Sequence, residues 1–203
     1  MIIPPTDAKA IPTVRRTLNH FGVGAIVLST IFILLFAIIV ANPSWAQKNY
    51  STTNAEVHFI AVDDSDIDAV NKNAVSRLQA NGDLSFIMLI KDFTFEMEGM
   101  QKHFNEEYLE SDQFPRAFFN GKITNFSTVN FAKDGKYPIT VSGTMQVHGV
   151  KKAMQTSGMI EIKNGLPIAT AKFTVTLKDF KIGGILIKMV ADKINIDISA
   201  ALL

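Results

Sequence analysis

The sequence contains no cysteine, a single tryptophan and only four histidines. Without cysteine the chain can form neither a disulfide framework nor a lipid-modified cysteine anchor, so its stability must come from a packed core. The histidines after the N-terminal region are His58, His103 and His148, and they fall in three separate segments. There is no GxSxG nucleophile elbow, no HExxH metal motif and no phosphate-binding glycine loop. These absences argue against an enzyme, and we expect no cofactor.

The charges are nearly balanced and form no long run of one sign. The whole chain has 20 basic and 19 acidic residues, and removal of residues 1–46 takes away Lys9, Arg15, Arg16 and Asp7, which leaves 17 basic and 18 acidic residues. A nucleic-acid partner requires a concentrated basic surface. We therefore expect no nucleic-acid binding.

One long apolar run, Phe21–Ala41, is present, and it follows Arg15 and Arg16. The run is long enough to cross a bilayer, and the small residues Ser44 and Ala46 stand at the two positions that a signal peptidase reads. This pattern predicts export, with cleavage after Ala46. If the segment is not cleaved, it anchors the protein in the membrane.

The chain therefore divides into a signal peptide or membrane anchor, residues 1–46, and a single folded domain, residues 47–203. With either outcome the folded domain lies outside the cytoplasm, in the periplasm or the extracellular space, because positive charge collects on the side of the run that stays inside. Membrane contact through residues 21–41 is expected only for the uncleaved form. The sequence leaves the oligomeric state open.

Alternation of apolar and polar residues is the dominant pattern of the folded part. It is clearest over Tyr137–Lys152, where the odd positions are apolar or small and the even positions are polar. Such a period of two predicts a strand with one dry and one wet face. Further strands are predicted at Glu56–Ala61, Asn73–Ala80, Leu84–Phe95, Arg116–Phe126, Lys151–Lys163, Pro167–Phe180 and Lys188–Ala200. The pairs Asn81-Gly82 and Asn164-Gly165 predict hairpins between neighbouring strands.

The apolar residues of the predicted strand Leu84–Phe95 change phase along the strand. Its apolar residues hold even positions from Leu84 to Ile90 and then odd positions at Phe93 and Phe95. A bulge near Lys91-Asp92 would restore the inward face. The alternative is a strand that is buried on both faces, at Ile87 and Leu89.

Two segments depart from the strand pattern. In Glu98–Glu110 the residues Met100, Phe104 and Tyr108 recur at helical spacing, which predicts a short helix inserted in the sheet. The acidic stretch Val62–Asn71 resembles a calcium loop only superficially, since it lacks the central glycine and the final glutamate. We interpret it as a solvated turn or one helical turn, and we expect no metal site.

Eight consecutive strands with one helical insertion predict an all-β fold, an eight-stranded antiparallel lipocalin-like barrel preceded by the N-terminal signal or transmembrane segment. Twelve phenylalanines and seven methionines follow Ala46, many of them on inward phases. Barrels of eight strands are either filled by such side chains or hold one small ligand. The patterns alone leave this choice open.

Several short motifs in a fixed order make the chain similar to a known family. They are His103-Phe104-Asn105, Tyr108-Leu109-Glu110-Ser111, Phe114-Pro115, Phe119, Gly121, Ile123, Gly143-Thr144-Met145, His148-Gly149-Val150, Lys152, Asp179 and Ile182. In this order they resemble the YceI-like proteins, exported lipocalin-like barrels associated with polyisoprenoid lipids, over about Ala55–Ile198.

The resemblance implies a non-catalytic carrier that holds a polyisoprenoid or similar long-chain amphiphile in the barrel. The alternative is an envelope stress or structural protein with a filled barrel and a protein partner. The predicted ligand-binding residues are Phe59, Phe86, Met88, Phe93, Phe95, Met100, Phe104, Phe119, Val141, Met145, Phe173 and Val175. The helix Glu98–Glu110 is the expected lid or wall of the pocket.

The histidines receive structural roles in this interpretation. His58 and His148 fall on the polar phases of their strands, which favours exposed surface positions over metal ligation, because zinc sites show closely spaced ligand pairs. His103 precedes Phe104 in the predicted helix, where a hydrogen bond that fixes the helix or the barrel mouth is expected.

Overall fold

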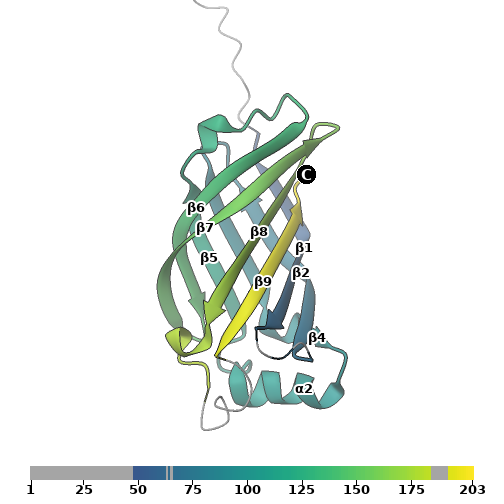
Figure 1. Ribbon diagram of the computed structural model, residues 1–203, viewed down its shortest axis with the longest axis vertical. Helices are drawn as coiled ribbons and strands as arrows, with labels where there is room; N and C mark the ends of the chain where they lie inside the picture. The colour runs from purple at the N-terminus through teal and green to yellow at the C-terminus, as the bar shows by residue number, and fades with distance from the viewer. Residues whose placement is uncertain (1–47, 63, 65, 184–191) are drawn as a thin grey trace, which may run out of the picture. The chain divides into compact units, whose positions relative to one another are not determined.

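The computed structural model describes residues 48–62, 64, 66–183 and 192–203, and these residues form a closed antiparallel β-barrel with one short helix at one end (Figure 1). The predicted fold class is therefore confirmed. The expected signal or anchor segment, residues 1–46, lies outside the described residues. So do residues 188–191 at the start of the last predicted strand. Within the described ranges, no helix has the length and apolar character needed to cross a membrane.

Eight long strands build the barrel wall, and each is antiparallel to its neighbours. They are β1 (Tyr50–Ala61), β2 (Asp68–Leu78), β3 (Asp83–Leu89), β5 (Arg116–Ile123), β6 (Gly135–Val147), β7 (Val150–Lys163), β8 (Leu166–Thr176) and β9 (Lys193–Ala201). The strands follow one another around the sheet in sequence order, and β1 pairs with both β9 and β2, which closes the barrel. Closure leaves no free edge at the ends of the strand order, the usual route to aggregation of a flat sheet.

Short elements cover the two ends. They are the 3-10 turns η1 (Ile90–Asp92), η3 (Phe126–Thr128) and η4 (Leu177–Phe180), the two-residue strand β4 (Thr94–Phe95), the helix α2 (Glu98–His103) and the π-helical turn η2 (Phe104–Tyr108). The predicted helix Glu98–Glu110 is thus present, although its second half is wound as a π-helix. The helix α2 lies across the end where β1 and β3 finish (Figure 1).

The change of phase after β3 is made by a turn, so the predicted bulge at Lys91-Asp92 is wrong. The Ile90 N–H donates to the Pro115 carbonyl at 2.9 Å and the Phe93 N–H donates to the Ile90 carbonyl at 3.3 Å, which winds one 3-10 turn. The turn leaves Ile90 and Phe93 both buried. The alternative of a strand buried on both faces is also wrong, because Ile87 and Leu89 are 40% and 42% exposed.

The strands β1 and β2 are longer than predicted, and the intervening turn is shorter. The polar residues before Glu56 join β1 because they pair with the end of β2, and Ser51 also exchanges two backbone hydrogen bonds with Leu203. In β2 the buried Asn71 side chain donates to the Leu89 carbonyl and accepts from the Asn73 N–H, each at 2.9 Å. Both polar atoms of the amide are therefore satisfied, which lets a polar residue occupy an inward position.

The strand predicted over Tyr137–Lys152 ends at Val147, and the separate strand predicted from Lys151 is present as β7, which begins at Val150. The chain reverses at His148 and Gly149, whose φ angles of 49° and 73° are those of a two-residue hairpin turn. Asn164 and Gly165 make the second such hairpin, with φ of 52° and 74°, as predicted. Only these left-handed backbone angles let a two-residue loop match the twist of the strands it joins.

The end of the barrel opposite α2 is sealed. A layer of fully or nearly fully buried aliphatic side chains crosses it; this sealing layer consists of Leu78, Ile123, Ile160, Ile162 and Leu202. Outside it lies an end plug of three aromatic rings, Tyr50, Phe126 and Phe131, with ring centroids 5.2 Å apart for Tyr50 and Phe131 and 5.5 Å apart for Phe126 and Phe131. Both groups belong to or pack on the main core.

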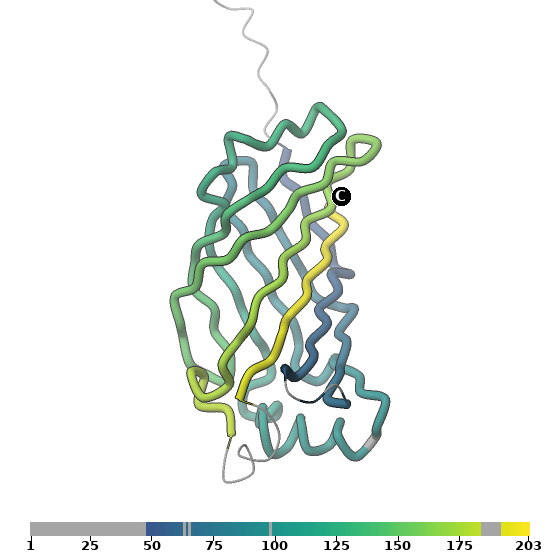
Figure 2. Tube along the Cα trace, viewed as in Figure 1, coloured from purple at the N-terminus to yellow at the C-terminus, as the bar shows by residue number. Residues whose placement is uncertain are grey.

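The ladder between β7 and β8 is incomplete. The strand β7 pairs with β6 over its whole length, but it pairs with β8 only between Gly158 and Lys163. Figure 2 shows the two strands diverging toward the α2 end. We call the stretch where they lie apart the seam, formed by Val150–Ser157 of β7 and Lys172–Thr176 of β8. Along the seam neither strand has a second ladder partner among the described residues.

Candidate functional site

The barrel encloses an apolar cavity of about 470 Å³. It extends from the α2 end to the sealing layer, and its lining is contributed by every long strand, by α2 and by the turns η2 and η4. Inward side chains at mid-barrel, such as Phe119, Met145 and Phe173, are only half-buried, whereas those of the sealing layer are almost completely buried. Side chains that face inward but remain accessible mark a hollow. This part of the barrel is therefore not filled by its own residues.

All twelve side chains predicted to contact a ligand line this cavity. Seven lie along the barrel wall, namely Phe86, Met88, Phe119, Val141, Met145, Phe173 and Val175. Five lie toward the α2 end, namely Phe59, Phe93, Phe95, Met100 and Phe104. Their role in binding stays a prediction, since the structure holds no ligand.

Four phenylalanine rings hold the inserted helical segment against the barrel. This aromatic cluster consists of Phe59 of β1, Phe93, Phe95 of β4 and Phe104 at the start of η2. Phe104 lies 5.5, 5.6 and 5.0 Å from the other three rings, centroid to centroid. Such aromatic pairs contribute about 0.5–1.5 kcal/mol each beyond the burial of their area. The segment is therefore a fixed wall of the cavity at this end, in part the lid or wall that the sequence predicted.

Polar groups border the cavity only near the helix and at a few wall positions. The side chains of His103, Glu107 and Tyr108 lie at the α2 end of the lining, with His103 Nδ1 2.7 Å from Glu107 Oε1. Burial, and secondarily the charge of Glu107, raises the pKa of Tyr108. The tyrosine therefore keeps its proton, and its hydroxyl can donate a hydrogen bond to a ligand head group at neutral pH.

A contact between distant segments ties the end of η2 to the β6–β7 hairpin. His148 Nε2 lies 2.7 Å from Glu110 Oε2, and the imidazole packs edge-on against Phe114 with ring centroids 4.4 Å apart. The His148 side chain is only 11% exposed. The prediction of an exposed strand histidine is therefore wrong. The residue lies in a turn, and its ring closes the corner behind the cavity wall.

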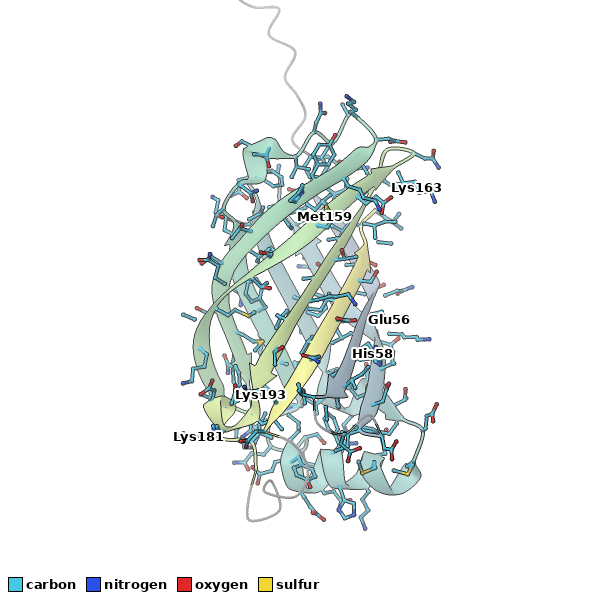
Figure 3. The ribbon with its side chains drawn as sticks, viewed as in Figure 1. Glu56, His58, Met159, Lys163, Lys181 and Lys193 are labelled. Carbon is cyan, nitrogen blue, oxygen red and sulfur yellow. The ribbon has the colours of Figure 1, made fainter. Side chains whose placement is uncertain are left out.

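The other two histidines also have structural partners. His58 lies on the outer face of β1 (Figure 3), where its Nε2 is 2.8 Å from Asp68 Oδ1. His103 is paired with Glu107 within one helical turn. Over the part of the chain that the structure describes, no three histidine, aspartate or glutamate side chains gather as a metal site would require.

Two glycines give the wall its closest backbone approach. Gly121 of β5 and Gly143 of β6 lie opposite each other, and the ring of Phe119 lies over both. A Cβ atom on Gly143 would stand 2.5 Å from the Gly121 Cα and 2.7 Å from the Phe119 Cζ. The glycines thus leave the space that lets Phe119 lie flat against the wall and keeps the lumen open.

Some lining residues were missed by the sequence-based selection. Met154 and Thr156 of β7 line the cavity beside the seam, and Phe180 and Ile182 close it near η4. The two residues of β7 could have been found from the sequence, because Met154, Thr156, Gly158 and Ile160 occupy alternate positions of the predicted strand. No periodic signal marks Phe180 and Ile182, because they lie in a turn.

A known protein family matches this chain. The family model of the YceI-like domain matches residues 45–202. The chain belongs to the YceI-like family. A search of curated proteins finds no significant match to this sequence.

Two solved structures agree with this chain in fold. One is a polyisoprenoid-binding domain from Saccharophagus degradans implicated in plant cell wall breakdown, with a TM-score of 0.65 and 10% identity over 76% of this chain and 95% of that domain. Another is BcnA of Burkholderia cenocepacia, with a TM-score of 0.59 and 12% identity over 73% of this chain and 94% of that protein. At these identities the likeness concerns the fold alone.

Many of the residues that carry the resemblance to the YceI-like family lie near the α2 end, although Gly121 and Gly143 lie in the middle of the wall and Ile123 lies in the sealing layer. Phe104, Tyr108 and Leu109 face the cavity there, while Glu110 and His148 form the contact behind it. The family pattern therefore extends along the barrel and includes the contacts that hold the α2 end together.

Proposed function

We propose that this YceI-like protein is an exported, non-catalytic binding protein that holds one isoprenoid or similar long-chain amphiphile in its lumen. The observation that carries the proposal is the hollow centre, a cavity of about 470 Å³ lined mainly by apolar side chains, of which Phe119, Met145 and Phe173 at mid-barrel are only half-buried. The lipid class named for the Saccharophagus degradans relative supports an isoprenoid. The apolar run before Ser44 and the family resemblance support export.

Burial of the hydrocarbon tail supplies the main favourable contribution to binding. Transfer of each methylene group from water into an apolar site contributes about 0.8 kcal/mol, so ten buried methylene groups contribute about 8 kcal/mol before the cost of association is subtracted. Away from the α2 end, the polar side chains among the described lining residues are only those of Ser76, Thr156 and Thr170. Recognition of the tail therefore depends on size and shape.

The ligand lies with its tail toward the sealing layer and its head group at the α2 end. The sealed end is apolar and closed by aromatic rings, whereas His103, Glu107 and Tyr108 border the α2 end. A head group there can exchange hydrogen bonds with the Tyr108 hydroxyl or with water. Buried in the sealed end, the same head group would lose its hydrogen bonds at a cost of about 1–3 kcal/mol.

Paired measurements of stability and lipid binding test this function. We expect Phe173→Ala and Met145→Ala to weaken titration of the delipidated protein with a long-chain isoprenoid alcohol. Each should cost less than the roughly 2–5 kcal/mol of a large-to-small change in a filled core, because a cavity already lies on one side of each side chain. Chemical denaturation of the same samples gives the stability.

Leu202→Ala is the matched control. Leu202 is 1% exposed in the sealing layer and does not line the cavity. We expect the full core-type loss of stability without any weakening of lipid binding. Full core-type losses for Phe173→Ala and Met145→Ala, together with no binding by the wild type, would instead support the filled structural barrel with a protein partner.

A further inference from the structure

We infer that the lumen limits the length of the ligand, and that it accepts a hydrocarbon tail of about 15–20 carbons, three to four isoprene units, with longer tails left partly outside. This inference rests on the proposed function, because it concerns the same cavity. It specifies which members of a broad lipid class fill the site.

The floor of the cavity is defined on several strands at once. Ile139, Ala169 and Ala200 line the cavity, whereas the next inward residues of neighbouring strands do not. Ile160, the cross-strand partner of Ala169, is 0% exposed, and Leu202, two residues beyond Ala200, is 1% exposed. The change from residues that line the cavity to residues that do not thus occurs within one inward step, which makes the floor a sharp boundary.

The material beyond the floor is fixed in place. The Ile123 N–H donates to the Gly82 carbonyl at 2.9 Å, and Ser51 and Leu203 exchange backbone hydrogen bonds of 3.0 and 3.1 Å. Phe126 packs so closely on Gly82 that a Cβ atom there would stand 2.8 Å from its ring. A tail that reaches the sealing layer would have to break these contacts to go farther.

The volume sets the number of carbons. A cavity of about 150 Å³ takes up one benzene molecule, which corresponds to roughly 25 Å³ per carbon. At that density a cavity of about 470 Å³ holds at most about 19 carbons. A tail of nine isoprene units would need more than twice this space. Its remaining carbons would lie outside the barrel, beyond the α2 end or the seam, where water reaches them.

The consequence is a plateau of affinity. While each added methylene group is buried, affinity should rise about fourfold, the equivalent of about 0.8 kcal/mol at 25 °C. Once the floor is reached, further carbons should add almost nothing. A lumen without a floor would instead give a continuous rise over the whole series.

In the test, the protein is purified as the cell produces it, bound lipid is removed, and the protein is titrated with primary alcohols. Straight-chain alcohols of 10 to 24 carbons provide fine steps, and prenyl alcohols of two, three, four and nine isoprene units provide the branched series. We expect a steep rise that ends between about 15 and 20 carbons in both series. Continued gain up to nine isoprene units would overturn the length limit while leaving the proposed function intact. Absence of binding throughout the series would overturn the proposed function itself.

Two variants move the floor in opposite directions. Ile160→Ala removes three carbons just beyond the floor and should extend the plateau by about three carbons. Ala169→Leu adds three carbons at the floor and should shorten it by a similar number, which keeps the test valid if Ile160→Ala does not fold. The matched control is Ile87→Ala, on the exposed outer face of β3, which should leave the plateau in place. A plateau that does not move in the folded variants would overturn the assignment of the floor.

Discussion

Replacement of Gly143 by alanine tests how closely β5 and β6 approach each other at the centre of the barrel wall. The new Cβ atom would stand 2.5 Å from the Cα of Gly121 and 2.7 Å from the Cζ of Phe119. Ordinary contacts between such atoms are about 3.5–4.0 Å. The strands must therefore separate by roughly 1 Å, since a backbone atom, unlike the end of a side chain, cannot rotate away.

The expected cost is about 1–3 kcal/mol, the range for overpacking of a well-packed core. For a folded unit of this size, 1 kcal/mol lowers the melting temperature by about 2–4 °C, so Gly143→Ala should lower it by about 2–12 °C. The measurement is thermal unfolding followed by circular dichroism, with urea denaturation as an independent readout.

The neighbouring Thr144→Leu is the matched control, because Thr144 faces solvent one position along the same strand. It adds a larger side chain than Gly143→Ala does, yet it should change stability by no more than about 0.5 kcal/mol. Truncation of Phe119 should not rescue Gly143→Ala, since the clash with the Gly121 backbone remains. Equal losses for Gly143→Ala and Thr144→Leu would show that the assignment of inner and outer faces in β6 is wrong.

Three further predictions concern other parts of the chain. N-terminal sequencing of the exported protein should return Gln47 as the first residue; Met1 from a membrane fraction would mean an uncleaved anchor. His148→Ala and Glu110→Ala should each destabilise the fold by about 1 kcal/mol, and the double variant should lose clearly less than the sum; additive losses would rule out a direct interaction. Burial raises the pKa of both Tyr50 and Tyr108, so the folded state keeps protons that the unfolded state releases. The contribution of these tyrosines to the free energy of unfolding should therefore be fully present below about pH 10 and be lost as the pH rises above it. Tyr50→Phe should make the loss of stability at high pH smaller, and an unchanged pH profile would contradict this prediction.

The alternation of apolar residues predicted most of the barrel because burial of one face is what fixes a strand in this fold. Phe173 and Met145 could be assigned to the lumen from their phase alone, and both line the cavity. The same pattern could not show where one strand ends and the next begins. Alternation continues across His148, and the hairpin there depends on two left-handed backbone angles that no hydrophobic pattern encodes.

Other errors arose where a tertiary contact overrides the local pattern. Asn71 is polar, so its segment was interpreted as a solvated turn, but hydrogen bonds to Leu89 and Asn73 let it stand inside β2. The beginning of β1 is equally polar, and its pairing with β2 and its hydrogen bonds to Leu203 were not visible in the sequence. Whether the lumen is hollow could not be decided from composition, because the same phenylalanines and methionines serve a packed core and a lined cavity.

The seam has a consequence for how the protein avoids association with itself. Peptide groups that face away from a ladder partner offer a template to which the strand of another molecule can add, even within a closed barrel. Lys151 and Lys152 on β7 and Lys172 on β8 are exposed beside this gap, and lysine is the residue that protects sheet edges most often, because an incoming strand would have to bury its charge. At high ionic strength this protection weakens, and strand addition along Val150–Ser157 becomes the route by which two barrels would join.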